Sequence, residues 1–469
     1  MNLKQFEKII LRELINENLA IFAGAGLSMG SGYVSWKELL RDIATDINLE
    51  IDKEHDLLSV AQYHVNKRSR NRINEKILNE FSEQAIENPM MNVICRLPID
   101  TIWTTNYDKL IEESMMKINK IVDVKITKKN LALNKKRKDV ILFKIHGDKD
   151  SPENAIITRD DYENFFRNKE LFVNRLLSDL VSKTFLFIGY SFGDPNFEHV
   201  LSKIRYELGD DSRQHYCFQQ SVKRSKYDND DDYNYAKIKQ ELRIEDLGKY
   251  NIETILVEEY SEITEFLGKI EFELYKKNIF ISGSAHEYKE FGSSEDSKRF
   301  ITKLIYKLIS EKNKIISGYG LGVGGYVVDG LVSGIFDNNL EVESYYLVRP
   351  FPQNIDKAKD KAIVWDNHRR RMISESTVSI FIFGNKLTNN KIELATGVYK
   401  EFVLSKENGN VIIPIASTGY MSKQIIEECK EDKDLWYLTD SYDVLCKEKN
   451  VEKIVDEIKI ILNRYKEGQ

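Results

Sequence analysis

The sequence predicts an α/β protein with two domains, each built on a parallel β-sheet. Short apolar runs alternate with longer segments in which apolar residues recur at helical spacing, a pattern typical of parallel sheets covered by helices. Glycines directly follow some of these runs, first at 24–26 and later at 318–325. The length of 469 residues also exceeds what one hydrophobic core usually supports. We therefore predict two Rossmann-like domains, the first with a helical insertion.

The first predicted domain spans residues 1–276. Apolar runs that predict buried strands recur along it, at 19–23, 99–104, 140–145, 184–188 and 252–257. Segments of helical character separate them, at 3–17, 36–95, from about 109, 165–180 and 261–276. Residues 36–95 form the expected helical insertion. Residues 222–240 are rich in Asp, Lys and Tyr, and we expect a mobile surface insertion there.

The second predicted domain spans residues 277–469 and repeats the alternation of strands and helices. Apolar runs that predict strands lie at 279–282, 314–317, 345–348, 378–383 and 411–415, with a helix at 300–310. Gly283 and Ser284 directly follow the first run, and the second opens into the glycine-dense segment 318–325. The two domains therefore share a strand-then-glycine arrangement.

Composition and charge exclude several classes of protein. Charged residues make up 31% of the chain and the net charge is -6, so we expect no binding to nucleic acid by bulk electrostatic attraction. No apolar run approaches the roughly 20 residues that a membrane helix needs, and residues 1–18 are too charged for a signal peptide. The four cysteines form no CxxC pair, which argues against a zinc ribbon. We expect a cytoplasmic protein with no membrane contact and no bound metal.

The glycines after the first strand indicate a phosphate-binding turn. They let the backbone approach a pyrophosphate closely, and the next helix would offer unpaired N–H groups. The fingerprint GxGxxG is imperfect, because the third glycine comes one residue late. On its own the pattern also fits a tight strand-to-helix turn. The residues expected to contact a dinucleotide here are Ala23, Gly24, Ala25, Gly26 and Ser28.

Polar residues follow the next strands at their carboxyl ends, where open α/β sheets bind ligands. Asn106 and Asp108 come just after the strand that ends at residue 104, and His146 follows the strand at 140–145. Histidine titrates near neutral pH, so His146 suits general base catalysis, while Asn106 can orient hydroxyl groups or a water. Asp108 also fits an Asx turn. The combination predicts a pocket that binds a dinucleotide and cleaves it.

A further polar string, Gly189 to Asn196, follows the strand at 184–188. Ser191 and Asp194 in this string are candidates for binding an adenosine ribose or for capping the next helix. We favour capping for Asp194, because Pro195 would occupy the first helical position, where proline is common.

These motifs, taken in order, resemble those of the sirtuin superfamily. The strings are Gly24-Ala25-Gly26-Leu27-Ser28, Thr105-Asn106-Tyr107-Asp108, His146-Gly147 and Gly189-Tyr190-Ser191. The form Thr-Thr-Asn-Tyr-Asp, followed later by Gly-Tyr-Ser-Phe-x-Asp-Pro-Asn, is similar to the bacterial defence branch of sirtuin-like domains. The resemblance implies that NAD lies across the glycines, with Asn106 near the nicotinamide ribose and His146 as the catalytic histidine. It also implies NAD contacts from Asp108, Gly189 and Ser191.

Two departures from deacylating sirtuins favour water as the acceptor. Those enzymes follow the first motif with Pro-Asp-Phe-Arg, where this chain has Gly32-Tyr33-Val34-Ser35-Trp36, and their four-cysteine zinc module is missing. The resemblance then implies cleavage of the nicotinamide–ribose bond, with NAD as the substrate, through an oxocarbenium-like transition state. Protein deacylation and a non-catalytic nucleotide-binding scaffold are the alternatives. A pure binder, however, needs no base at His146.

The glycine-dense turn in the second domain predicts a second phosphate-binding site. Gly320, Gly322 and Gly324 would form the cradle, together with Gly283 and Ser284 at the neighbouring strand end. A flexible loop is the alternative interpretation.

Charged residues near that turn are candidates for reading the phosphates and riboses of a ligand. Arg369 and Arg371 precede the strand at 378–383, and arginine forks match phosphate geometry. Lys386 follows that strand, and Glu401 on the next helix could accept from ribose hydroxyls. Each of the four also fits a solvated surface.

The second half resembles the SLOG superfamily of nucleotide-sensing proteins. Its hydrolase members carry Pro-Gly-Gly-x-Gly-Thr-x-x-Glu, and no such acid follows the glycines here, so binding rather than catalysis is implied. A sirtuin-like domain joined to a SLOG domain resembles the effectors of the Thoeris anti-phage system. That resemblance implies an NAD hydrolase that stays quiet until a cyclic ADP-ribose isomer, made by a TIR-domain partner, binds the SLOG domain. Abortive infection by NAD depletion and a homo-oligomer, expected to be a tetramer, are also implied.

Overall fold

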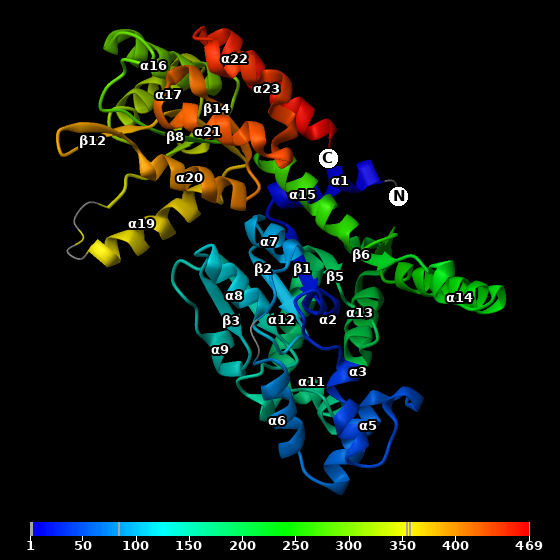
Figure 1. The fold of residues 1–469 in the computed structure, drawn as a ribbon. Helices are drawn as coiled ribbons and strands as arrows, with labels where there is room; N and C mark the ends of the chain where they lie inside the picture. The colour runs from blue at the N-terminus through cyan, green and yellow to red at the C-terminus, as the bar shows by residue number, and fades with distance from the viewer. Residues whose placement is uncertain (1–2, 83–84, 353–354, 356–357, 469) are drawn as a thin grey trace. The chain divides into compact units, whose positions relative to one another are not determined.

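The computed structural model describes residues 3–82, 85–352, 355 and 358–468 (Figure 1). The chain divides into two compact units, Met1–Ile270 and Glu271–Gln469, and the division falls within helix α15 (Ser261–Tyr275). Each unit is an α/β structure around a parallel sheet. This confirms the predicted fold class.

The first unit is built on a seven-stranded sheet with the order β3-β4-β2-β1-β5-β6-β7. Every neighbouring pair in it is parallel. The strands are β1 (Leu19–Ala23), β2 (Thr101–Thr104), β3 (Val122–Lys125), β4 (Val140–Lys144), β5 (Thr184–Ile188), β6 (His215–Gln220) and β7 (Ile252–Val257). Strand β1 is central, and the chain order reverses there, so the glycines after β1 lie at the switch point where such sheets bind ligands.

Apolar residues bury both faces of this sheet. All of β1 and β5 is buried, and Trp103 of β2 stacks on Phe143 of β4 with ring centroids 4.2 Å apart. Helices cover the faces: α1 (Leu3–Ile15), α2 (Ala25–Met29), α8 (Leu110–Lys117), α9 (Lys128–Ala132), α10 (Arg159–Glu163), α11 (Phe165–Asn168), α12 (Glu170–Ser182) and α13 (Pro195–Leu208). The helix expected over 165–180 is thus divided between α11 and α12.

The helical insertion lies between β1 and β2, as predicted. It consists of α3 (Trp36–Leu39), α4 (Arg41–Thr45), α5 (Leu57–Lys67), α6 (Asn71–Glu80) and α7 (Pro89–Arg96), drawn in blue in Figure 1. Side chains cap several of these helices. For example, Asn88 accepts from the Met91 N–H at the start of α7.

Part of the segment 222–240, expected to be a mobile surface insertion, forms a regular helix on the surface. Asp230–Gly248 is a regular helix, α14, which Figure 1 shows extending from the β6 side of the unit. Asn229 caps it by accepting from the Asp232 N–H at 2.8 Å, and the acidic residues of its first turn favour the positive end of the helix dipole. Only Leu247 of this helix is buried, so its sequence has no apolar face that would predict a helix.

The second unit is built on a five-stranded parallel sheet with the order β10-β9-β8-β11-β14. Its strands are β8 (Asn278–Ser284), β9 (Lys314–Ser317), β10 (Tyr346–Val348), β11 (Val378–Phe383) and β14 (Val411–Ile415). An antiparallel hairpin, β12 (Asn385–Thr388) and β13 (Lys391–Leu394), follows β11 and was not predicted. The helices are α16 (Ser294–Ser310), α17 (Gly324–Asp337), α18 (Val342–Tyr345), α19 (Ala358–Ile373), α20 (Thr396–Glu407), α21 (Tyr420–Glu431), α22 (Tyr442–Lys447) and α23 (Val451–Glu467).

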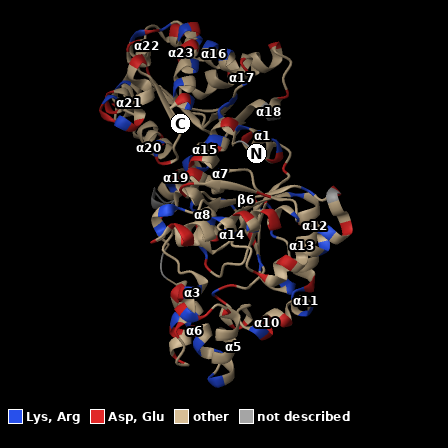
Figure 2. Ribbon diagram, turned by 90° about the vertical axis from the view of Figure 1, so that its right-hand side faces the viewer, with Lys and Arg blue, Asp and Glu red and all other residues tan. Residues whose placement is uncertain are grey.

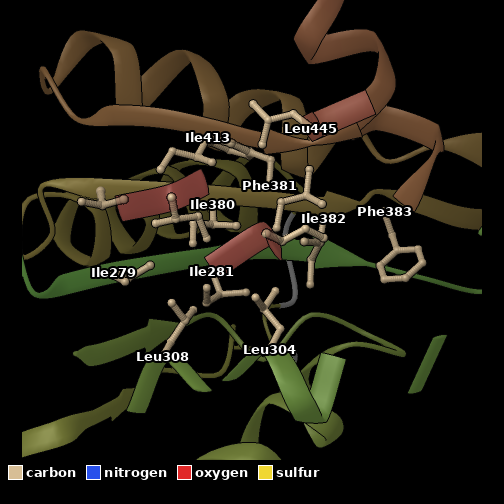
Figure 3. Close-up of a cluster of buried hydrophobic side chains, with 14 of the residues drawn as sticks. Ile279, Ile281, Leu304, Leu308, Ile380, Phe381, Ile382, Phe383, Ile413 and Leu445 are labelled. Carbon is tan, nitrogen blue, oxygen red and sulfur yellow. The ribbon is translucent and has the colours of Figure 1, made fainter. Parts of the chain in front are cut away.

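The core of this unit forms around β8 and β11. Figure 3 shows Ile279 and Ile281 of β8 beside Ile380 and Ile382 of β11, with Leu304 and other helical side chains packed against them. Figure 2 shows basic and acidic residues interspersed on the helices. Among the described residues, no helix is both long enough and apolar enough to cross a lipid bilayer.

Candidate active site

A cavity of about 610 Å³ opens in the first unit at the carboxyl ends of its central strands. It is lined by segments that are far apart in sequence: the β1–α2 turn, the loops after β2 and β5, and the ends of β4 and β6. The sequence-predicted residues among its lining are Ala25, Gly26, Ser28, Asn106, Asp108, His146, Gly189 and Ser191. The structure therefore brings most of the predicted first-site residues to one cavity.

The glycines of the first motif allow two loops to pack backbone against backbone. A Cβ on Gly24 would lie 2.4 Å from the Gly189 carbonyl oxygen, and one on Gly26 would lie 2.8 Å from the Gly189 Cα. Gly189 itself has a φ of +65°, which favours glycine. The Gly26 N–H donates to the Gly189 carbonyl at 2.9 Å, so this amide is already engaged. The Ala25 N–H, at the start of α2, has no backbone acceptor among the described residues and remains free for a phosphate.

The Thr-Thr-Asn-Tyr-Asp loop holds Asn106 in one orientation. Thr104 donates its hydroxyl to the Ala23 carbonyl at 2.9 Å and accepts from the Asn106 N–H at 3.0 Å. The Asn106 side-chain amide then donates to the Gly24 carbonyl at 3.0 Å and to the Ser28 hydroxyl at 2.9 Å. Because its N–H donors are engaged, the Asn106 Oδ1 atom is left as the acceptor for a ligand.

Asp108 and Tyr107 anchor the rest of that loop. Asp108 accepts from the Leu110 N–H at 2.9 Å at the start of α8, which is the turn chemistry considered for it, and it also lines the cavity. Tyr107 donates its hydroxyl to the Ile156 carbonyl at 2.7 Å. Burial, reinforced by the charge of Asp108, raises the pKa of the neighbouring Tyr33 to about 12.

A buried charged cluster supports the same loop. Lys144, on β4, donates to the Tyr107 and Asp108 carbonyls, and its ammonium lies 2.5 Å from Asp148 and 3.2 Å from Glu112. Burial raises the pKa of Asp148, but the charge of Lys144 and a hydrogen bond from Lys109 outweigh it and leave the pKa below its ordinary value. Sequence reasoning missed this cluster, which is marked in the sequence by no more than a lysine at the end of an apolar strand.

His146 is 5% exposed and faces the carboxylate of Asp194, for which the sequence favoured helix capping. Its Nε2 atom lies 3.0 Å from Oδ2 of Asp194, although the two are not aligned as a hydrogen bond. Asp194 also caps α13 as expected, since its Oδ1 accepts from the Asn196 and Phe197 N–H groups at 2.9 and 3.3 Å. Burial raises the pKa of Asp194, but the interaction with His146 and these N–H donors outweigh it, so the pKa is lowered.

Unpartnered polar atoms around the cavity indicate a polar ligand. Buried atoms without a hydrogen bond among the described residues are rare in folded proteins. Here such atoms belong to Trp36, His146, Tyr190 and Gln219, all of which line this cavity. Trp36, Tyr190 and Gln219 were missed as site residues, because an aromatic ring or an amide beside a strand has no distinctive spacing. No group of three or more His, Cys, Asp or Glu side chains in the described ranges is placed to hold a metal ion.

In the second unit, the predicted glycines join two loops. A Cβ on Gly320 would lie 2.0 Å from the Gly283 carbonyl oxygen, and one on Gly322 would lie 1.8 Å from the Ala285 carbonyl oxygen. A Cβ on Gly324 would meet the Tyr319 backbone at 2.7 Å. The glycines therefore bring the β8–α16 and β9–α17 loops into direct backbone contact.

The charged residues predicted for the second site are only partly brought together. Glu401 accepts from the Ser282 hydroxyl at 2.6 Å and from the Arg369 guanidinium at 3.3 Å. Burial raises the pKa of Glu401 despite these partners. Ser284 donates to the Asn385 carbonyl, next to the half-buried Lys386. Arg371 is exposed on α19, and no contact in the described part of the chain joins its side chain to the others.

Comparison with known proteins identifies the class to which this fold and cavity belong. Residues 100–255 match the SIR2-like domain family, and residues 262–465 match the Sir2- and TIR-associating SLOG family. The chain is therefore a sirtuin-like domain followed by a SLOG domain, which confirms both resemblances.

The relatives identify a particular family of this architecture. The chain is 43% identical to NAD(+) hydrolase ThsA of Bacillus cereus (strain MSX-D12), over 92% of this chain and 90% of that one. It is 39% identical to NAD(+) hydrolase ThsA of Acinetobacter baumannii (strain 532279), over 96% and 98%. It is 27% identical to Defense-associated sirtuin 2 of Bacillus subtilis, over 44% and 21%. The chain belongs to the ThsA family.

Proposed function

We propose that this protein hydrolyses NAD to nicotinamide and ADP-ribose in anti-phage defence. The observation that carries the proposal is the meeting of Asn106 and His146 at one cavity with the glycines of the β1–α2 turn. The names of the relatives, NAD(+) hydrolase and Defense-associated sirtuin, support the substrate and the setting. NAD is the substrate, and no metal is required by the chemistry below.

The chain's own residues account for each part of the reaction. The bond between nicotinamide and C1′ of the ribose breaks, nicotinamide leaves with the bonding electrons, and an oxocarbenium-like ribose develops. Asn106 offers its Oδ1 atom to a ribose hydroxyl or to the attacking water, and His146 takes the proton of that water as it bonds to C1′. The Asp194 carboxylate, 3.0 Å away, stabilises the charge that His146 gains. The proton then leaves to solvent.

The two domains of the chain have different roles in this proposal. Residues 1–276 form the NAD-cleaving domain, and residues 277–469 form the nucleotide-sensing domain. A cyclic ADP-ribose isomer, made by a TIR-domain partner, binds the second domain at the glycines and at Arg369, Arg371, Lys386 and Glu401. Activation depletes NAD in the cytoplasm and stops the infected host, and the working form is a homo-oligomer, expected to be a tetramer.

Nicotinamide release from NAD, with and without cyclic ADP-ribose isomers, tests the catalytic assignment. Asn106→Ala and His146→Ala should each lower the rate by about 10²-fold or more, because general acid–base groups contribute 10²–10⁴-fold. His199→Ala, on the exposed side of α13, is the matched control and should keep wild-type turnover. Circular dichroism confirms that each variant folds. Wild-type turnover in both cavity variants would refute the assignment, and protein deacylation or a scaffold would become the better explanation.

A titration of the activator tests the second site. Arg371→Ala or Lys386→Ala should raise the concentration of cyclic isomer needed for half-maximal activation by about tenfold, because each removes a charged phosphate contact. Basal nicotinamide release should not change. Lys391→Ala, on the same hairpin as Lys386, is the control. If both site variants respond as the wild type does, the activator pocket lies elsewhere.

A further inference from the structure

The strand order divides the cavity into two halves. Strand β1, with its phosphate-binding turn, is central; β2 and β4 lie on one side, and β5, β6 and β7 lie on the other. A dinucleotide in such a sheet places its pyrophosphate at the central turn and one nucleoside on each side. Asn106 follows β2 and His146 follows β4, so the nicotinamide riboside occupies that half. The adenosine therefore lies over β5, β6 and β7.

The adenosine half has an unusual distribution of polar groups. It is lined by Ser191, Phe218, Gln219, Arg243 and Tyr260. Gln219 follows Phe218 near the end of β6 and carries a buried Oε1 atom with no hydrogen-bond partner among the described residues. Arg243 comes from α14 and donates to the Ser191 carbonyl. Within the described ranges, no carboxylate lies within ion-pair distance of the Arg243 guanidinium, so its charge is uncompensated by the protein.

The carboxylates that line the cavity have other partners than Arg243. Among the described lining residues these are Asp108, after β2, and Asp194, which lies on the loop after β5 but faces His146 at 3.0 Å and caps α13. Sheets of this kind that prefer NAD hold the adenosine ribose diol with a carboxylate, which repels a 2′-phosphate, whereas an arginine at that place accommodates the phosphate. Gln219 carries no charge and can present either an acceptor or a donor.

We propose that the adenosine half accepts a 2′-phosphate, that NADP is a second substrate, and that Arg243 is the specificity-determining residue. The proposal rests on the proposed NAD hydrolysis and extends its substrate class. The reaction is the same: the nicotinamide–ribose bond breaks, water adds to C1′ and gives up a proton, and the products are nicotinamide and 2′-phospho-ADP-ribose. Arg243 takes no part in the bond change, because His146 and Asn106 act in the other half.

Calorimetric titration of the full-length His146→Ala chain measures binding without turnover. ADP-ribose and 2′-phospho-ADP-ribose are the probes. We expect the 2′-phosphorylated probe to bind at least as tightly as ADP-ribose. Adding Arg243→Gln should weaken the 2′-phosphorylated probe by about 10- to 100-fold, as expected for a lost charge-assisted hydrogen bond, and ADP-ribose by less than about threefold. Lys239→Gln, which changes another exposed cation of α14, should affect neither.

Two binding results would overturn the proposal. Equal weakening of both probes by Arg243→Gln would place the guanidinium at the pyrophosphate. Binding of ADP-ribose more than about 100-fold tighter than that of its 2′-phosphate would show that the site rejects the phosphate.

Nicotinamide release from NAD and from NADP by the otherwise unchanged chain, measured with cyclic ADP-ribose isomers present, separates the two proposals. Release from both substrates, with Arg243→Gln lowering kcat/KM for NADP alone, supports both. Release from NAD but not from NADP overturns only the NADP proposal. If no nicotinamide is released from NAD, hydrolysis is refuted. The existence of the 2′-phosphate subsite is then tested by the binding data alone, through selective weakening of the 2′-phosphorylated probe by Arg243→Gln.

Discussion

At the scale of single residues, the cavity depends on side chains that do two tasks at once. Asn106 bridges two loops through its amide donors and leaves its Oδ1 atom for a ligand. Asp194 caps α13 and faces His146. Lys144 holds the loop that carries Asn106 and neutralises Asp148. Substitutions that preserve one task and remove the other can therefore separate structure from catalysis.

Asp194→Asn should lower nicotinamide release by about 10²-fold with little loss of stability. Asparagine caps helices about as well as aspartate, so α13 should keep its first turn. The charge beside His146 is lost, so the protonated ring formed during the reaction is no longer stabilised. The measurement is kcat and KM together with the melting temperature, and the loss should appear in kcat.

Asp56→Asn is the matched control for that substitution. Asp56 caps α5 by accepting from the Ser59 N–H and does not line the cavity. It should leave turnover unchanged. If Asp194→Asn lowers the melting temperature as much as Asp194→Ala does and kcat is retained, Asp194 acts only as a helix cap.

Lys144→Met should destabilise the first unit by about 1.5–3 kcal/mol, the usual cost of losing a hydrogen bond to a buried charged group. The charge left behind is Asp148, which is fully buried and keeps only Lys109, at 2.8 Å, as a cationic partner among the described residues. Urea unfolding followed by circular dichroism measures the change. The double variant Lys144→Met/Asp148→Asn should recover part of the loss, because it also removes the stranded charge. No recovery in the double variant would contradict the ion-pair explanation.

At the scale of elements, the β5–β6 pair carries a histidine that makes stability depend on pH. His215 begins β6, and its Nδ1 atom accepts from the Phe185 N–H of β5 at 3.1 Å. Burial, assisted by the charge of Arg213, lowers the pKa of His215 to about 3. The folded chain therefore keeps this ring neutral at pH values where the unfolded chain would protonate it.

The stability of the first unit should consequently fall as the pH drops from about 6.5 toward 3. In that window the unfolded state binds a proton at this site and the folded state does not, so the loss is about 1.4 kcal/mol per pH unit. His215→Asn, which keeps an acceptor for Phe185, should flatten this dependence. The free energy of unfolding at pH 7, 6 and 5 is the measurement. The exposed His55→Asn is the control, and an unchanged slope in His215→Asn would refute the assignment.

At the scale of the whole molecule, each unit has its own hydrophobic core. One core surrounds Trp103 and Phe143, and the other surrounds Ile380 and Phe381. Among the described residues, all strands of each parallel sheet come from one unit. We therefore expect the units to unfold as separate cooperative bodies.

Phe381→Ala should shift one calorimetric transition and leave the other in place. Phe381 is fully buried in the second unit, and truncating a core phenylalanine costs about 3–5 kcal/mol. Differential scanning calorimetry of the full chain is the measurement, with the exposed Val332→Ala on α17 as the control. A single transition that moves as a whole would show that the two cores unfold together.

Local pattern accounted for the framework of both units and for the motifs at the first cavity. Buried parallel strands are nearly continuous apolar runs, so β1, β5 and β11 were predicted within a residue or two. Strands β3 and β6 were missed, because the first mixes Asp123 and Lys125 with valines and the second begins at His215 and ends in glutamines. Helix α14 was missed for a similar reason, since capping rather than an apolar face marks it.

The sequence by itself determined the α/β class, the two-domain order and the set of polar residues at the strand ends, because these follow from local periodicity and from chemistry placed next to glycines. Only the tertiary structure decided which of those residues meet. Asp194 faces His146, and Arg243 reaches the Ser191 carbonyl from a helix some fifty residues further along the chain. The physical reason is that such contacts depend on strand order and helix placement, which many distant packing interactions set together and no short segment encodes.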